Sequence, residues 1–342
     1  MTQARGGGKG SRAMQVVARL HAAPPRHNAG AEWMAWSMFR ALVERGHEVT
    51  VWLSRYGEDH GPYELDGVKV VPLESRLDFA TAVRRASVLV SHLENVPSTA
   101  ALARGYGKPF VAICHNTFLP TFRDMASGST ALAVYNSQWM AREAELHFVD
   151  HPKGIRPDRS IVVRPPVFAK EYAAKPGDRV TLVNTNPEKG GLLFHKLAKR
   201  MPDIKFLAVK GSYGEQTDYS DLSNVEEVEH VSGHEMRDKV YARTRLLLMP
   251  SSYESWGRAG VEALASGIPV LAHPTPGLCE SLGEGGIFIE RQDLDGYEAV
   301  IRKLRTASEY RLAGKRAKAR SAELDPAADL AAWCGAVEGL AR

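Results

Sequence analysis

Two glutamates stand eight positions apart in the segment YESWGRAGVEALASGIPV (253–270). Glu254 falls in a loop that follows an apolar run, whereas Glu262 is flanked on both sides by Ala, Gly, Val and Leu, so no solvated face contains it. A carboxylate in such a setting needs a partner. Because carboxylates accept strong charge-assisted hydrogen bonds, the two acids could hold two separate hydroxyl-bearing parts of one ligand. The ordinary alternative is a helix cap at Glu254 and a solvated Glu262.

Two other segments are suited to phosphate. In NTNPEKGG (184–191), Lys189 leads two glycines into a helical stretch, and a lysine at a glycine-rich helix entry can act as a point charge for phosphate. In PTPGLCES (274–281), a glycine follows a strand-like run and precedes a helix start, where backbone N–H groups attract anions. A solvated lysine and an ordinary glycine turn are the alternatives.

Histidines and tryptophans mark the first half of the chain. Trp33 and Trp36 lie three positions apart; we expect one to pack in the core, and the other could stack on an acceptor ring. Because the histidine spacings match no standard zinc pattern, we expect no metal site. The four histidines near predicted strand ends are His21, His27, His92 and His115.

The elements that must position these residues alternate in type. Apolar runs of strand length alternate with helical patterns, which indicates parallel sheets covered on both faces. The pattern restarts after a proline-rich stretch, so two doubly wound α/β halves are joined near 168–178. Ligands of such sheets bind beyond the carboxyl ends of the strands. The predicted strands are 14–20, 47–54, 68–74, 86–92, 108–116, 131–137, 180–186, 204–211, 245–251 and 269–275, and the predicted helices 32–46, 98–107, 190–201, 234–244 and 257–267.

Composition excludes several classes of protein. The 342 residues are 44% hydrophobic and 25% charged, as in ordinary soluble globular proteins. A formal charge of +4 suits anionic small ligands and is too mild to indicate nucleic acid. The three cysteines are widely spaced and odd in number, which favours a reducing compartment over disulfides. With no apolar run of membrane-spanning length and no signal peptide, we expect a cytoplasmic protein, with peripheral membrane association left open.

The ordered series of motifs resembles the retaining glycosyltransferases of the GT-B fold, family four (glycosyl transferases group 1). The likeness runs from Met14 to about Arg291 and is strongest in the second half. It rests on NAGAEWMAWSMFRALVERGHEVTV (28–51), VYNSQWM (134–140), VRPPV (163–167), PEKG (187–190), SGHEM (232–236), PSSYESWGRAGVEALASGIPV (250–270) and TPGLCE (275–280).

The resemblance implies two Rossmann-like domains facing a central cleft. Residues 14–168 would form an acceptor-side domain and residues 169–320 a nucleotide-sugar domain. Residues 321–342 would form a helix that packs back on the first domain, with Trp333 as its anchor. Residues 1–13 are expected to be a disordered basic lead-in.

The resemblance also implies roles for individual residues. Glu262 would hold the ribose hydroxyls of the donor, Glu254 would face the transferred sugar and Lys189 the diphosphate. Gly30 would allow close approach to the diphosphate, and His115 would face the donor sugar across the cleft. The catalytic set is therefore Glu254, His115 and Lys189. The remaining donor-binding candidates are Asn184, Gly277, Leu278, Cys279 and Glu280, and the acceptor candidates are Trp33, His92 and Asn116.

Two departures from the family pattern concern the diphosphate. Asn184 stands where the family usually has an arginine, and Arg258, Lys210 or Arg26 would have to replace that charge. Ala29–Gly30 stands where the family has two glycines.

The implied reaction moves a sugar from a nucleoside diphosphate sugar, UDP-linked rather than GDP-linked, to an acceptor hydroxyl with retention. A front-face route without metal or cofactor is expected, the nucleotide sugar being a co-substrate. The acceptor stays open among glycan, lipid, small molecule and modified DNA base. A sugar-nucleotide epimerase or hydrolase and a catalytically inactive nucleotide-sugar-binding protein are the alternatives. Glu262→Ala is expected to weaken donor binding far more than folding.

Overall fold

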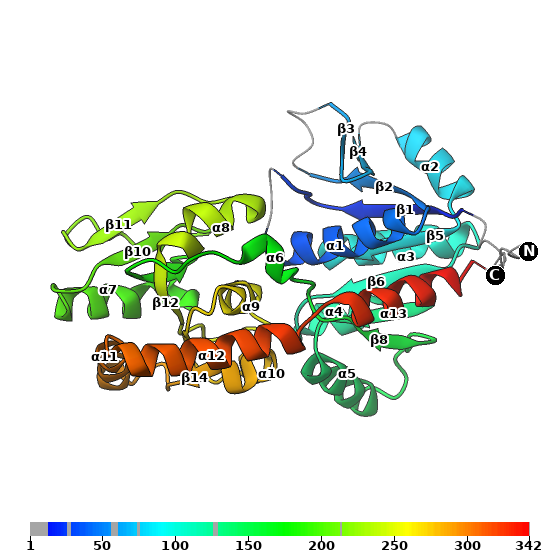
Figure 1. Ribbon diagram of the computed structural model, residues 1–342. Coiled ribbons are helices and arrows are strands. Elements are labelled where there is room, and N and C mark those ends of the chain that lie inside the picture. The colour runs from blue at the N-terminus through cyan, green and yellow to red at the C-terminus, as the bar shows by residue number, and fades with distance from the viewer. Residues whose placement is uncertain are drawn as a thin grey trace, which may run out of the picture.

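A computed structural model describes residues 13–25, 29–55, 61–73, 76–125, 129–212 and 214–341. Its strands form two separate sheets, one in each of two lobes that lie side by side (Figure 1). The predicted fold class, two doubly wound α/β units, is confirmed. The predicted lead-in lies outside the described residues except for Ala13.

The first lobe holds an eight-stranded sheet in the order β3-β4-β2-β1-β5-β6-β7-β8. Its neighbouring strands pair in parallel except β3 and β4, which are antiparallel. The strands are β1 (Gln15–Leu20), β2 (Glu48–Leu53), β3 (Tyr63–Leu65), β4 (Val68–Pro72), β5 (Val88–His92), β6 (Phe110–Cys114), β7 (Leu132–Tyr135) and β8 (Ser160–Val162). Its helices are α1 (Gly30–Glu44), α2 (Arg76–Arg85), α3 (Val96–Gly105), α4 (Leu119–Asp124) and α5 (Gln138–Asp150).

The second lobe holds a six-stranded, fully parallel sheet in the order β11-β10-β9-β12-β13-β14. Its strands are β9 (Arg179–Val183), β10 (Phe206–Val209), β11 (Val225–Val228), β12 (Thr244–Met249), β13 (Val270–Ala272) and β14 (Gly286–Phe288). Its helices are α7 (Gly191–Arg200), α8 (Met236–Lys239), α9 (Arg258–Ala265), α10 (Pro276–Leu282) and α11 (Leu294–Lys303).

The prediction of one helix over 234–244 is wrong. Only α8, four residues long, is α-helical there, and single 3₁₀ turns precede and follow it. The chain must enter β12 at Thr244, which leaves no room for a further helical turn. The Thr244 hydroxyl also donates to the Val240 carbonyl and so closes the segment.

Both sheets are buried on two faces, as parallel sheets require. All five residues of β5 and of β6 are buried, and apolar clusters lie on each side of each sheet. This explains why these strands read as continuous apolar runs rather than as an alternation. Because both faces of each sheet are covered, ligands bind at the loops that follow the carboxyl ends of the strands.

Two crossings connect the lobes. After β8 the chain passes Pro165 and Pro166 and the short α6 (Ala169–Tyr172) into the second lobe. From there α12 (Ala307–Glu323) leads back to α13 (Ala327–Glu338), which lies along the first lobe beside α1 (Figure 1). Trp333 on α13 is fully buried, and its Nε1 donates to the Met38 carbonyl of α1 at 2.9 Å.

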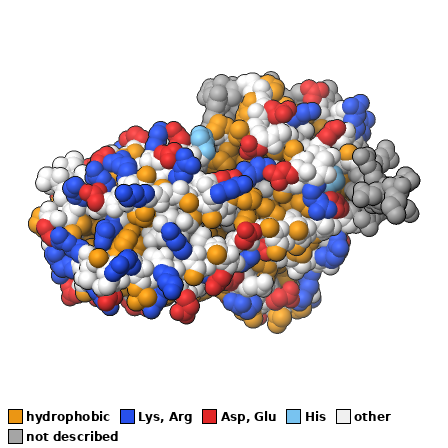
Figure 2. Space-filling view, viewed as in Figure 1, with side chains coloured by type: hydrophobic (Ala, Val, Ile, Leu, Met, Phe, Trp, Pro, Cys, Tyr) orange, Lys and Arg blue, Asp and Glu red, His pale blue; other side chains and the backbone are white. Residues whose placement is uncertain are grey.

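The surface carries charges of both signs. Figure 2 shows basic and acidic side chains interspersed over both lobes on the face in view, in keeping with the modest net charge. Within the described part of the chain, none of the helices combines the length and apolar character needed to cross a lipid bilayer.

Candidate active site

An open cavity of about 1050 Å³, solvent at its mouth included, lies between the two lobes. The first lobe contributes Ala29, Gly30 and Trp33 from the start of α1, and the second lobe lines the rest. The carboxyl ends of β9, β10 and β12 meet there, which is where a parallel sheet binds its ligand. Among the predicted site residues, the cavity lining includes Gly30, Trp33, Asn184, Lys189, Glu254 and Glu262.

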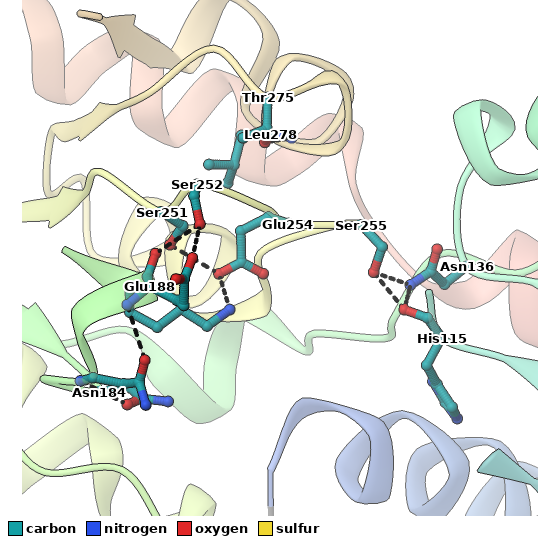
Figure 3. Close-up of polar contacts among 12 residues, drawn as sticks. His115, Asn136, Asn184, Glu188, Ser251, Ser252, Glu254, Ser255, Thr275 and Leu278 are labelled. Carbon is teal, nitrogen blue, oxygen red and sulfur yellow. Dashed lines mark hydrogen bonds and ion pairs between the residues drawn. The ribbon is translucent and has the colours of Figure 1, made fainter. Parts of the chain in front are cut away.

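Lys189 and Glu254 contact each other directly. The Lys189 Nζ lies 2.6 Å from Glu254 Oε1, and the Ser251 hydroxyl donates to the same oxygen at 3.2 Å (Figure 3). The Lys189 side chain is 32% exposed and that of Glu254 16%, so the pair borders the cavity without being sealed from it. A cation and a carboxylate therefore meet at one point of the cleft.

The loop that carries Lys189 is held tightly. A 3₁₀ turn, η3 (Pro187–Lys189), ends at Gly190, whose φ of +100° suits glycine. A Cβ at Gly190 would come within 2.2 Å of the Pro250 ring, and one at Gly191 within 2.2 Å of the Thr185 carbonyl oxygen. The two glycines thus allow the lysine loop to pack against the end of β12, beside Glu254.

Glu262 is buried and paired. Its carboxylate accepts from Arg258 Nε and from the Tyr241 hydroxyl, both at 2.7 Å, while it lines the cavity from α9. Burial raises the pKa of Glu262 above its ordinary value. The expectation that this carboxylate needs a partner is confirmed, and the partner is an arginine four residues earlier on the same helix. Its role toward ribose stays a prediction.

Arg258 also binds the crossing between the lobes. Its two terminal nitrogens donate to the Pro166 carbonyl at 2.6 Å and to the Tyr172 hydroxyl at 2.9 Å. With Nε on Glu262, every nitrogen of this guanidinium has a protein partner. Arg258 therefore serves the packing of α9 and is not free to replace the absent arginine at Asn184.

Asn184 shapes the turn at the end of β9. Its φ is +69°, and its side-chain oxygen accepts from the Asn186 amide at 3.2 Å. Of the charges proposed to compensate for it, Lys210 lines the cavity and pairs with Glu229 at 2.7 Å, and Arg26 lies outside the described residues.

Gly30 begins α1 at the cavity wall. A Cβ built on Gly30 would have nothing within 4 Å, so it would project into open space rather than into protein. The ring of Trp33, one turn later, packs against Gly233 of the second lobe, where a Cβ would come within 2.4 Å of it. Trp36 is buried, with its Nε1 on Asp66 Oδ2 at 3.0 Å, so the expected packing role falls to Trp36.

The start of α10 has protein partners. Thr275 caps this helix: its hydroxyl accepts from the Leu278 amide at 3.3 Å, and its carbonyl from the Cys279 amide at 2.8 Å. The Leu278 and Cys279 amides therefore have protein partners in this arrangement, and the anion-binding role of this helix start stays a prediction. The Gly277 backbone packs against the backbone of 254–255, since a Cβ would lie 2.3 Å from the Glu254 carbonyl oxygen.

Glu280 reaches across to the first lobe. Its two carboxylate oxygens accept from the backbone amides of Gln138 and Trp139, each at 2.7 Å, at the start of α5. Neither Glu280 nor the residues 277–279 line the cavity. Their donor-binding role remains a prediction, and the structure gives Glu280 an interlobe contact.

His115 and His92 contact each other at the ends of β6 and β5. The Nε2 of His115 lies 2.9 Å from Nδ1 of His92, and the His115 ring points toward α1 and away from Glu254 (Figure 3). Burial lowers the pKa of His115 to about 4, so its ring is neutral at pH 7. His92 is fully buried, so the prediction that it contacts an acceptor is wrong for this arrangement. The role of His115 toward the donor sugar stays a prediction.

Two family models match the chain, one in each lobe. The model described as Glycosyltransferase Family 4 matches residues 28–167, and the model described as Glycosyl transferases group 1 matches residues 185–320. The chain belongs to the group 1, family 4 glycosyltransferases.

Solved structures share the fold of this glycosyltransferase. Alr3699/HepE of Anabaena in complex with UDP-glucose is similar with a TM-score of 0.75 and 16% identity, over 94% of this chain and 98% of that one. Sucrose-phosphate synthase of Thermosynechococcus elongatus is similar with a TM-score of 0.68 and 15% identity, over 93% and 97%.

One curated relative is similar over a shorter stretch. The GtfA subunit of the UDP-N-acetylglucosamine–peptide N-acetylglucosaminyltransferase of Streptococcus parasanguinis is 28% identical over 109 residues. That stretch is 30% of this chain and 21% of the relative.

Several residues that shape the site of this glycosyltransferase were not found from the sequence. Tyr241 holds Glu262 from a distant segment and had no local signal. The Tyr253 hydroxyl accepts from the Thr117 amide at 2.8 Å, and the Ser255 hydroxyl donates to the His115 carbonyl at 2.5 Å, both across the cleft. Tyr253 and Ser255 flank Glu254 in the sequence, and their hydroxyl groups were the only local sign that they could bond across the cleft.

The acceptor candidate Asn116 shapes its own loop. Its side-chain oxygen accepts from the Phe118 amide at 3.1 Å and from the Thr121 hydroxyl at 2.6 Å, at the start of α4. Phe118 is 56% exposed and stacks on Tyr253 of the other lobe, with ring centroids 5.0 Å apart. The acceptor roles of Asn116 and Trp33 stay predictions.

Proposed function

We propose that this glycosyltransferase moves a hexosyl group from a nucleoside diphosphate sugar, UDP-linked rather than GDP-linked, to an acceptor hydroxyl with retention of configuration. The observation that carries the proposal is the meeting of Lys189, Glu254 and Glu262 at one cavity between the lobes. The sugar, diphosphate and ribose of a nucleotide sugar all need polar partners, and the cavity lining offers two acids and a cation.

The diphosphate belongs at Lys189. A departing nucleoside diphosphate develops negative charge, and a positioned ammonium group stabilises that charge directly. Ala29 and Gly30, at the start of α1, line the same cavity, and a helix N-terminus favours anions. These protein charges support a route that needs no metal ion.

Glu254 then serves the sugar. When phosphate draws Lys189 away, the Glu254 carboxylate becomes available to accept hydrogen bonds from sugar hydroxyls. Glu262 also lines the cavity and would accept from ribose while its charge stays paired with Arg258. Closure of the lobes would exclude water from the activated sugar.

The choice of UDP rests on relatives. The Anabaena structures are described with UDP-glucose and with UDP, and the streptococcal relative is named for UDP-N-acetylglucosamine. Glycan, lipid, small-molecule and modified DNA-base hydroxyls all fit the proposal as acceptors.

The test is incubation of the protein with UDP- and GDP-sugars, with and without candidate acceptors, in buffer containing EDTA. We expect release of UDP and a product whose anomeric proton coupling, measured by NMR, equals that of the donor. Epimerised donor would instead identify an epimerase, and binding without turnover an inactive binding protein. Inversion at the anomeric carbon, or loss of activity in EDTA that Mg²⁺ or Mn²⁺ restores, would contradict the proposed route.

A further inference from the structure

A second cluster of chemically active side chains lies at the carboxyl edge of the first sheet. His21 follows β1, His92 ends β5 and Glu32 stands in the first turn of α1. One ligand atom from each of the three lies within 4.8 Å of the other two. None of the three lines the cavity between the lobes, so the donor site does not account for them.

We propose that His21, Glu32 and His92 bind a divalent transition-metal ion of the zinc type. Two imidazoles and one carboxylate form the ligand set of open, three-ligand zinc sites. Mg²⁺ and Ca²⁺ prefer all-oxygen sites, so this set selects against them.

The distances suit a shared ion. His21 Nε2 lies 3.2 Å from Glu32 Oε1. Two ligands that each sit about 2.1 Å from one tetrahedral zinc ion are separated by roughly 3.4 Å, so little movement is needed. The other Glu32 oxygen accepts from the Ala29 amide at 2.8 Å, which fixes the carboxylate in place.

A buried ring nitrogen of His92 supports the metal site independently of the distances. Its side chain is fully buried and its Nδ1 is occupied by His115, while its Nε2 has no hydrogen-bond partner among the residues that the structure describes. A buried polar atom without a partner is costly, and a metal ion at Nε2 would remove that cost. The centroids of the His21 and His92 rings lie 5.4 Å apart.

His115 becomes the outer partner of the site. A metal ion on His92 Nε2 leaves the proton on Nδ1, which then donates to His115 Nε2. Replacing an outer partner of this kind weakens metal binding about tenfold or more. The proposed site therefore touches the histidine that the family resemblance places near the donor sugar, without entering the donor cavity.

The test is titration of the tag-free, EDTA-treated full chain with Zn²⁺ against a chromophoric chelator, and with Co²⁺ followed by its visible absorption. All proteins carry His147→Gln and His151→Gln, because these two rings stack at 4.4 Å at the C-terminal end of α5 and their paired imidazoles would compete for added zinc. We expect one ion per chain. His21→Gln, Glu32→Gln and His92→Gln should each weaken binding well over about tenfold, and His115→Gln about tenfold.

The control is His234→Gln, a histidine bonded to Ser232 in the second lobe, which should leave affinity unchanged. Glu32→Gln keeps an oxygen for the Ala29 amide, so this variant should fold even if His92→Gln does not. X-ray absorption of the zinc-loaded parent chain should show two imidazoles and oxygen ligands. Absence of stoichiometric binding, or wild-type affinity in the folded variants, would overturn the site.

Discussion

The contact between Lys189 and Glu254 places opposite charges 2.6 Å apart in the cavity. In the proposed function, a diphosphate competes with the carboxylate for the ammonium group, so donor binding would release Glu254. The lysine would then be more important than its partial exposure indicates.

Replacement of Lys189 by alanine is expected to lower kcat about a hundredfold, because loss of one group that stabilises developing charge costs that much. The protein should remain folded, since the lysine is partly exposed. Lys196→Ala, at an exposed position of α7, is the matched control and should keep full activity. Steady-state UDP release measures both, and equal rates for the two variants would refute the role of Lys189.

The ion pair between Glu262 and Arg258 makes Glu262→Ala a poor test of donor binding. Glu262→Ala leaves the buried Arg258 charge unpaired, and breaking a buried pair costs about 3–5 kcal/mol. The expectation that Glu262→Ala weakens donor binding far more than folding is therefore replaced by an expected drop in Tm as well.

Glu262→Gln is the better test of donor binding. Glutamine keeps an oxygen for the Tyr241 hydroxyl and should retain more stability than alanine. We expect its affinity for UDP to fall at least about tenfold, as loss of a charge-assisted hydrogen bond predicts. Calorimetric titration with UDP measures this affinity. Unchanged affinity in a folded Glu262→Gln protein would show that Glu262 does not bind the ribose.

The site was predictable where residue type and spacing carry the signal. The small residues around Glu262 indicated burial, and Arg258 stands four positions earlier, at helical pairing distance. The burial of His92 was not predictable, because a histidine at a strand end has the same local pattern whether it faces solvent or a neighbouring imidazole. Tyr241 reaches Glu262 only through the tertiary fold.

At the scale of elements, α13 is held to the first lobe by charge as well as by packing. Glu338 contacts Arg45 at 2.7 Å and the buried His47 at 3.0 Å. Hydrogen bonds from Arg45 and His47 lower the pKa of Glu338 below its ordinary 4.5. A lowered carboxylate pKa means that the contact stabilises the fold above pH 4.5 and is lost as pH falls below it.

Glu338→Gln is therefore expected to lower the free energy of unfolding by about 1 kcal/mol at pH 7, a modest value because Arg45 is half exposed. The loss relative to the parent chain should shrink as pH falls below 4.5. Denaturant unfolding at pH 7 and pH 4 measures this. A difference that grows on acidification would have the wrong sign and would contradict the contact.

Most strands and several helices followed from periodicity, whereas α5, the long α12 and the short elements were not predicted. The β3–β4 hairpin was missed although Asp66–Gly67 marks it: both residues have positive φ, at 51° and 76°, as a two-residue hairpin turn requires. The segment around α8 was overestimated because its apolar spacing is helical, while the start of β12 limits its length.

At the scale of the whole molecule, the lobes meet through Glu280. Its carboxylate caps α5 of the opposite lobe by accepting from Gln138 and Trp139, where the first amides of a helix lack internal partners. This contact and the one between Tyr253 and Thr117 hold the cleft in the observed arrangement.

Glu280→Ala is expected to speed hydrogen exchange at the amides of Gln138 and Trp139 at least about tenfold, since a hydrogen bond to a charged group contributes about 1.5–3 kcal/mol. A larger radius of gyration in solution scattering should accompany it. Glu284→Ala, at an exposed position just beyond α10, is the control. Unchanged exchange at α5 would show that the lobes are held elsewhere.

Cys279, the residue before Glu280, can report on separation of the two lobes. Cys114 and Cys334 are buried and Cys279 is exposed, so a maleimide dye modifies the folded chain at Cys279. Burial of part of that side chain raises the pKa of its thiol, which keeps the thiolate scarce and the labelling slow enough to time. The native chain thus accepts one fluorophore beside the seam between its halves, with no cysteine added or removed.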